Sequence, residues 1–202
     1  MAKILLLYAH PGQRFSLANQ AMMAQARTIE NITIVDLYAE YPRHKIDVEK
    51  EQARLIEHDV IVFQFPVYWY STPSLLKEWQ DLVLQHGFAF GEHGNALKGK
   101  TLMLAVTAGG PEDAYSQEGY QHHPLRSFLL PLEQTAALCK MRFATPYALY
   151  GALAGDQPEE IAAHAQGYKE LLSLIRDDAY DFDAAETQDV IMSATLPLPA
   201  KG

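Results

Sequence analysis

The sequence predicts an α/β fold in which a five-stranded parallel sheet is covered by helices on both faces, a doubly wound arrangement of three layers (α/β/α). Two observations carry this prediction. Short, continuously apolar segments are typical of parallel strands buried on both faces, and helical segments alternate with them along the chain. Right-handed crossovers then favour the strand order 2-1-3-4-5. The expected strands cover residues 3–8, 32–37, 59–65, 100–106 and 141–145.

The first half of the chain alternates clearly between the two kinds of element. After the first strand, Ser16 is placed to cap a helix over 16–28 that is rich in Ala, Met and Gln. Residues 38–47 follow the second strand and contain a proline and no clear period, so we expect a loop there. Residues 48–58 have a helical period and lead into the third strand.

The second half continues the pattern. We expect a helix over 72–86, because its proline lies near the start, the position in a helix where proline is favoured. Residues 124–138 predict a mostly apolar helix that Pro131 kinks, and residues 158–176 predict an amphipathic helix after the short fifth strand. We expect loops over 87–99, which is rich in glycine and has little periodicity, and over 109–121.

Length, charge and cysteine content narrow the class of protein. The 202 residues suit one domain, which we expect over 1–178, followed by a tail over 179–202 that is loose or packed on a partner subunit. The net charge of −9 argues against nucleic acid and anionic lipid as partners. The single cysteine, Cys139, excludes an intramolecular disulfide and lies in an apolar stretch, so we expect a small buried hydrophobe rather than a catalytic thiol.

The first residues of the chain and its hydropathy indicate the cellular compartment in which we expect the protein. The first strand begins at Lys3, which leaves no room for a signal peptide. No apolar run approaches the roughly 20 residues that a membrane span needs. Together with the absence of disulfides, these features predict a cytoplasmic protein.

Three segments follow the first, third and fourth strands and are candidates for a ligand site, because ligands of doubly wound sheets bind where the carboxyl ends of the strands meet. The first segment runs over 10–19. Its helix start offers amides, a dipole and the Ser16 hydroxyl to a phosphate, and His10 and Arg14 can add charge-assisted hydrogen bonds. Taken alone, it is equally compatible with a strand-ending turn. The residues assigned to the phosphate are His10, Ser16, Leu17, Ala18 and Asn19.

The second segment, over 65–70, has more large aromatic residues than a solvated loop needs. A flat ring such as the isoalloxazine of a flavin fits them, with the amides of Val67 to Trp69 at its N5 and O4 edge. The alternative is that these aromatic residues belong to the core or to a dimer interface. The residues assigned to the ring are Pro66, Val67, Tyr68, Trp69 and Tyr70.

The third segment is Thr107-Ala108-Gly109-Gly110. Glycine lets the backbone approach a ligand closely, and these amides are suited to the N1 and O2 edge of the ring, where negative charge accumulates on reduction. The alternative is an ordinary turn. The residues assigned to this edge are Thr107, Ala108, Gly109 and Gly110.

Two further residues are candidates for catalysis. The phenol of Tyr115 lies just beyond the third segment and is suited to a quinone oxygen or to charge on the flavin, unless it is a surface tyrosine. His122 and His123 are adjacent, do not converge readily on one ion and have no Cys or acidic partner at ligand spacing, so we expect no metal site.

With these residues in place, the chain resembles the flavodoxin-fold NAD(P)H:quinone reductases of the DT-diaphorase type. Within that group it is similar to the ancillary proteins of bacterial glutathione-regulated potassium efflux systems. The resemblance covers roughly residues 3–176 in order. The matching stretches include Leu7-Tyr8-Ala9-His10-Pro11, Asp36-Leu37-Tyr38, Ile46-Asp47, Glu51-Gln52, residues 59–76, Lys77 with Trp79, and Val106-Thr107-Ala108-Gly109-Gly110.

The resemblance implies a flavodoxin-like fold, a homodimer with active sites at its interface, and a tightly bound flavin, FMN, with FAD as the alternative. It implies that NAD(P)H reduces the flavin, which then reduces a quinone with two electrons. Position by position, His10 and residues 16–19 would hold the phosphate and ribityl end, residues 67–70 would line the ring and residues 107–110 would approach its pyrimidine edge. It also implies cytoplasmic docking on a membrane potassium efflux protein, which would hold the chain at the inner membrane.

One position departs from the family pattern. The larger diaphorases use a tyrosine and a histidine six residues later; Tyr115 fits the first, but Gln121 stands at the second, with His122 one place off. Glutamine cannot relay a proton near neutral pH, so either His122 substitutes after a loop shift or quinone reduction proceeds without this relay. Two functions stay open: a flavin-dependent NAD(P)H:quinone oxidoreductase, and a non-catalytic flavin-binding regulatory subunit of a potassium/proton antiporter. A flavodoxin-like electron carrier is disfavoured, because its Ser/Thr/Gly-rich phosphate loop is absent.

Overall fold

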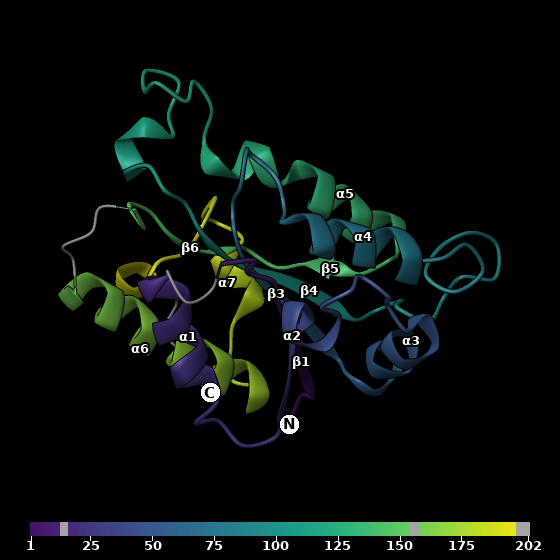
Figure 1. Ribbon diagram of the computed structural model, residues 1–202. Coiled ribbons are helices and arrows are strands. Elements are labelled where there is room, and N and C mark those ends of the chain that lie inside the picture. The colour runs from purple at the N-terminus through teal and green to yellow at the C-terminus, as the bar shows by residue number, and fades with distance from the viewer. Residues whose placement is uncertain (13–15, 154–157, 197–202) are drawn as a thin grey trace.

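The computed structural model describes residues 1–12, 16–153 and 158–196 and confirms the predicted α/β fold (Figure 1). The parallel strands lie in the predicted order β2-β1-β3-β4-β5, and β6 also pairs with β4. The strands are β1 (Ile4–Tyr8), β2 (Ile32–Asp36), β3 (Val60–Pro66), β4 (Thr101–Thr107), β5 (Arg142–Phe143) and β6 (Tyr147–Leu149). The helices are α1 (Leu17–Ala26), α2 (Leu37–Glu40), α3 (Val48–Glu57), α4 (Ser74–Val83), α5 (Leu130–Leu138), α6 (Pro158–Arg176) and α7 (Phe182–Ala185).

The two faces of the sheet carry separate cores because side chains alternate along each strand. Leu5 and Leu7 of β1 pack with residues of α3, α4 and α5, whereas Leu6 and Tyr8 pack with residues of α1 and α6. Figure 1 accordingly shows α1 and α6 side by side, across the sheet from α4 and α5. Cys139 is buried in the first of these cores, which confirms it as a small hydrophobe. None of the described helices is both long and apolar enough to cross a bilayer.

The prediction of a loop over 38–47 is wrong at its start. The carboxylate of Asp36 accepts hydrogen bonds from the amides of Tyr38 and Ala39, at 3.1 Å each, and this cap begins the short helix α2 directly after β2. Asp at this position is a strong N-cap, because it satisfies amides that have no partner within the helix.

The fifth strand is divided in two. Arg142 and Phe143 pair with the start of β4, and residues 147–149 pair with its end. Pro146 lies between the two pieces and has no N–H to give to the sheet. The predicted strand over 141–145 therefore includes the first piece and misses the second.

Pro131 does not kink a long helix. Residues 125–129 form a 3₁₀ helix, and α5 begins at Leu130, which places Pro131 in the first turn of α5. Amide groups in the first turn of a helix have no partner within the helix, so a proline there removes no hydrogen bond.

The described part of the predicted tail lies on the sheet of its own chain. Ile191 is buried, and its amide and carbonyl pair with Pro146 and Ala148 at 2.9 Å each, beside β6. The Thr145 hydroxyl donates to the carbonyl of Ala185 at 2.9 Å. Residues 179–196 thus cover the edge of the sheet, while a division of the chain at residue 178 stays a prediction.

Candidate active site

Two adjoining cavities open at the carboxyl edge of the sheet. The first has a volume of about 270 Å³ and the second about 320 Å³, and they share Val67, Gly109 and Leu153. All three candidate segments line the first cavity, as the strand-end rule predicts. Its lining residues are His10, Gly12, Ser16, Pro66, Val67, Tyr68, Thr107, Gly109, Ala152 and Leu153. The second is lined by Val67, Trp69, Tyr70, Gly109, Gly110, Tyr115, Tyr120, Gln121 and Leu153.

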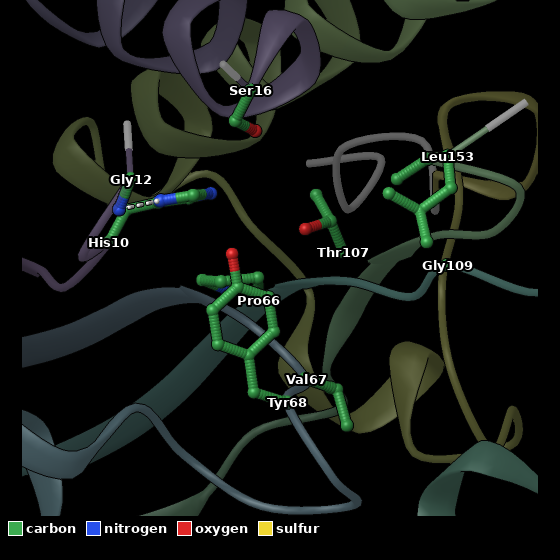
Figure 2. A pocket seen from close by; sticks show the side chains of 10 residues that line it. His10, Gly12, Ser16, Pro66, Val67, Tyr68, Thr107, Gly109 and Leu153 are labelled. Atoms are coloured by element: carbon green, nitrogen blue, oxygen red, sulfur yellow. Dashed lines mark hydrogen bonds between the residues drawn. The ribbon is translucent and has the colours of Figure 1, made fainter. Parts of the chain in front are cut away.

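The two cavities differ in chemistry. Polar side chains converge on the first: Figure 2 shows the outer ring nitrogen of His10 and the hydroxyl groups of Ser16, Tyr68 and Thr107 pointing into one space. The second is surrounded mainly by aromatic side chains and glycine backbone. A ligand with a polar end and a flat ring would match the pair.

Asn19 holds the polar end together from behind. Its side-chain amide donates to Ser16 Oγ at 3.0 Å and to Thr107 Oγ1 at 2.9 Å, and the residue is buried. Gln64 of β3 donates in turn to the backbone and side-chain oxygens of Asn19, at 3.3 and 3.4 Å. Ser16 also caps α1 by accepting from the amide of Asn19. The helix start and the ends of β3 and β4 are therefore joined by one buried network.

His10 is buried at the edge of the first cavity. The residue is 5% exposed, and burial lowers its pKa below the ordinary value, so the imidazole is neutral at pH 7 in this structure; a charge-assisted hydrogen bond from it to a phosphate stays a prediction. Its Nδ1 faces the amide of Gly12 at 3.1 Å, the dashed line in Figure 2, and its ring meets that of Tyr68 edge to face. Arg14, the other predicted cation, lies outside the described residues.

The aromatic segment is a tight turn in an unfavourable backbone conformation. Tyr68 and Ser71 exchange two backbone hydrogen bonds of 3.0 Å, and Trp69 and Tyr70 between them have φ of 48° and 64°. A two-residue turn with positive φ at both positions usually contains Asn and Gly, and large side chains there cost of order 1–3 kcal/mol each. Trp69 is also 91% exposed. Strain of this kind combined with exposure is typical of a functional surface.

Several backbone amides that we expected to contact a ligand donate instead to backbone carbonyl groups of the protein. Val67 donates to Thr107 O at 2.9 Å, and Tyr68 donates to Ser71 O. Ala108 donates to Leu149 O at 2.8 Å. The amides of Val67 and Tyr68 are therefore not free for the predicted contacts with a ring, and the Gly110 amide contacts the phenol of Tyr115.

Tyr115 lines the second cavity beside Gly110. Its ring contacts those of Phe128 and Tyr150. Burial raises the pKa of its phenol, with the Gly110 amide acting in the opposite direction, so the phenol keeps its proton at neutral pH. The geometry suits a hydrogen-bond donor to a group in the cavity.

Other predicted residues lie further from the cavities. Leu17 is exposed, while Ala18 and Ala108 are buried in the layers beneath. His122 is exposed and lines neither cavity, whereas Gln121 lines the second. The loop shift that would bring His122 to the relay position is thus not seen.

Leu153 was missed by sequence reasoning, although it stands between the two cavities and is 84% exposed. Its loop is fastened to the glycine segment by hydrogen bonds from Gly151 to Gly110 O and from Ala152 to Ala108 O, at 2.7 and 2.9 Å. The loop follows β6, so recognition of that strand would have placed it at the same sheet edge.

The chain matches a known family over most of its length. The family described as having a flavodoxin-like fold matches residues 2–172. The glutathione-regulated potassium-efflux system ancillary protein KefG of Cronobacter sakazakii is 48% identical over 172 residues, which cover 85% of this chain and 93% of that protein. KefG of an Enterobacter species is 46% identical with the same coverage.

Solved structures agree with this match. General stress protein 14 of Treponema denticola, solved in complex with FMN, is 36% identical, with a TM-score of 0.81 over 86% of this chain and 99% of that one. An NADPH-quinone reductase from P. pentosaceus is 30% identical, with a TM-score of 0.76 over 84% of this chain and 96% of that one. The resemblance read from the sequence is confirmed: the chain belongs to the flavodoxin-like fold family and, within it, to the relatives of the KefG ancillary proteins.

Proposed function

We propose that this chain is an FMN-dependent NAD(P)H:quinone oxidoreductase. The observation that carries the proposal is the pair of joined cavities at the carboxyl edge, polar at one end and aromatic at the other. The likeness to an FMN complex and to an NADPH-quinone reductase, at 36% and 30% identity, supports the same class of oxidoreductase.

The described residues fit FMN by the chemistry of their donors. The cavity that would hold the phosphate contains His10, Ser16 and Thr107 and lies at the positive end of the α1 dipole, an arrangement that favours an anion. Gly109 and Gly110 leave the second cavity open where a Cβ would meet Leu153 or Tyr120, at 2.7 Å in each case. Both features suit a phosphorylated flavin whose ring lies against Val67 and Gly109.

Bound FMN would supply the capacity to accept a hydride from NAD(P)H and to pass two electrons to a quinone. The protein would bind the phosphate end, and the turn at Trp69 and Tyr70 would hold the ring side of the cavity. Tyr115 would keep its proton and donate a hydrogen bond toward the second cavity, where it can stabilise charge that develops on an oxygen. With Gln121 beside it, proton delivery to the product would come from solvent or from Tyr115.

A homodimer with sites at its interface would explain the exposed apolar residues around the second cavity. Trp69, Tyr120 and Leu153 are 91%, 65% and 84% exposed, and Tyr70 is half exposed. Aromatic residues are enriched in protein interfaces, and a second copy would cover this surface and narrow the opening for a quinone.

A second candidate function rests on a separate observation, the 46–48% identity to KefG ancillary proteins. We propose in parallel that the chain binds a membrane potassium efflux protein from the cytoplasmic side, with or without turnover. The net charge of −9 suits a basic partner surface. In this function flavin binding would be regulatory.

One titration separates a catalytic flavin from a purely regulatory one. The purified protein is reconstituted with FMN, and anaerobic NADPH and then menadione are added while the absorption spectrum is recorded. Bleaching by about one equivalent of NADPH, followed by recovery with menadione, supports the oxidoreductase. A bound flavin that neither NADPH nor NADH bleaches supports the regulatory subunit, and failure to bind FMN or FAD contradicts both.

A further inference from the structure

We infer that Asn19 and the Gly12 amide fix the hydrogen-bond polarity of the first cavity, so that Ser16 and His10 can act there only as donors and Thr107 keeps its proton as a donor. This makes the polar end a site for an acceptor group such as a phosphate. The inference rests on the proposed function and deepens it, because it assigns the selection of a phosphorylated over an unphosphorylated flavin to residues behind the cavity.

Asn19 uses both of its side-chain N–H groups on hydroxyl oxygens that line the cavity. One is donated to Ser16 Oγ at 3.0 Å and the other to Thr107 Oγ1 at 2.9 Å. Ser16 Oγ accepts a second hydrogen bond from the Asn19 backbone amide at 3.3 Å. A hydroxyl has one proton and two lone pairs, so Ser16 has only its proton left to offer. Thr107 is left with its proton and one lone pair.

The orientation of the Asn19 amide is determined by its neighbour. Gln64 Nε2 lies 3.3 Å from Asn19 O and 3.4 Å from Asn19 Oδ1. A reversed Asn19 amide would set its own donor against this donor, so the position of Gln64 decides the orientation. The observed orientation satisfies all of these contacts at once, and it is locked because Asn19 and Gln64 are both buried.

His10 is held as a donor by the same logic. Its Nδ1 accepts the Gly12 amide at 3.1 Å, and burial keeps the ring neutral at pH 7. The one ring proton must therefore be on Nε2, the nitrogen that Figure 2 shows pointing toward Ser16 and Thr107. The described residues that line this cavity include no Asp, Glu, Lys or Arg, and the polar hydrogens that they direct into it belong to neutral groups.

The first test compares FMN with riboflavin, which lacks the phosphate, by quenching of flavin fluorescence. In Asn19→Asp the carboxylate would accept both hydroxyl protons, turn them away from the cavity and expose lone pairs instead. We expect FMN affinity to fall by at least about 100-fold, the loss of two hydrogen bonds to a charged group, and riboflavin affinity to change by less than about threefold. Asn31→Asp, the same change at an exposed turn, is the matched control.

A second variant separates polarity from simple charge repulsion. The double variant Ser16→Ala with Thr107→Val already lacks both hydroxyl donors. Adding Asn19→Asp to it should therefore lower FMN affinity by less than a further factor of about ten. A full additional 100-fold loss would mean that charge alone acts, and would overturn the inference. If Asn19→Asp does not fold, Thr107→Val tests the inference by itself. The ratio of the riboflavin dissociation constant to the FMN dissociation constant must then be at least about fivefold lower in this variant than in the wild-type protein.

The last measurement needs no flavin. Two-bond ¹⁵N–¹H correlation spectra of the unliganded protein at pH 7 should show His10 with its proton on Nε2, and a proton on Nδ1 would overturn the inference. A wild-type protein that binds FMN and riboflavin equally would also overturn it while leaving the flavin site intact. A protein that binds neither flavin would contradict the proposed function, and the tautomer of His10 would still be measured.

Discussion

Asn19 and Thr107 are 88 positions apart in the chain, yet the side-chain amide of one donates to the hydroxyl of the other at 2.9 Å inside the protein. This hydrogen bond joins the first turn of α1 to the end of β4 behind the first cavity. It couples the geometry of the polar end to the packing of the sheet, so changes elsewhere along this edge should alter ligand binding.

The strained turn at Trp69 and Tyr70 should lower the stability of the protein and strengthen its binding of FMN. Replacing Trp69-Tyr70 with Asn-Gly, residues that adopt positive φ readily, should raise the free energy of unfolding of the flavin-free protein by about 1–2 kcal/mol. The same change should weaken FMN binding, because the ring side of the cavity loses its aromatic wall. Urea unfolding and fluorescence titration measure the two effects. Trp69→Phe with Tyr70→Phe keeps the strain and is the control; an unchanged stability in the Asn-Gly variant would contradict the prediction.

A methyl group at Gly109 should obstruct the site with little effect on the fold. Its Cβ would lie 2.7 Å from Leu153 Cδ1, the end of an exposed side chain that can move. We expect a change in unfolding free energy within about 0.5 kcal/mol and roughly a tenfold loss of FMN affinity. The double variant Gly109→Ala with Leu153→Ala tests the route: recovery of affinity means that Leu153 is displaced into the cavity, and no recovery means that the methyl group itself blocks the ligand.

The phenol of Tyr115 should matter for turnover rather than binding. Because burial raises its pKa, the group stays protonated through neutral pH and can donate to a developing oxygen charge. Tyr115→Phe should lower the rate of quinone reduction by about 10- to 100-fold with FMN affinity unchanged. Stopped-flow measurement of flavin reoxidation by menadione reports this step. Tyr120→Phe, in the same cavity but 65% exposed, is the control and should change the rate less than twofold.

His164 should make the protein acid-sensitive. It is 1% exposed, stacks on Tyr147, and burial lowers its pKa from 6.5 to about 3. Below about pH 6.5 this histidine binds a proton in the unfolded chain but not in the folded chain. Its contribution to the free energy of unfolding is therefore fully present above pH 6.5 and is lost as the pH falls toward 3. The slope should reach about 1.4 kcal/mol per pH unit. Urea unfolding of His164→Phe should lose this component, and His93→Gln, at an exposed site, should retain it.

The segment after residue 178 should be part of the folded unit. Ile191 is fully buried and pairs with β6, so Ile191→Ala should lower the free energy of unfolding by about 2–5 kcal/mol. Met192→Ala, at the next and partly exposed position, should cost less than half as much. Equal, small effects in urea unfolding would instead favour a loose tail.

Local pattern was sufficient for the fold and for the location of the site. The buried strands β1, β3 and β4 are continuous apolar runs, and the segments that follow them must meet at one edge of a parallel sheet. The sequence also placed Tyr115 and Gln121 at two positions of the family pattern, with His122 left open as a substitute, and both residues line the second cavity. These features depend on residues close together in the chain, where apolar runs, caps and glycines act directly.

Tertiary structure alone decided the rest. β6 has three residues after Pro146, too few for a recognisable pattern, so the loop that carries Leu153 to the site was not foreseen. The neutral state of His10 follows from burial by distant segments, and the donor role of Ser16 and Thr107 follows from an asparagine that reaches both. Most residues near the site could be located from local pattern, but hydrogen-bond direction and protonation depend on contacts between segments that only the folded chain brings together.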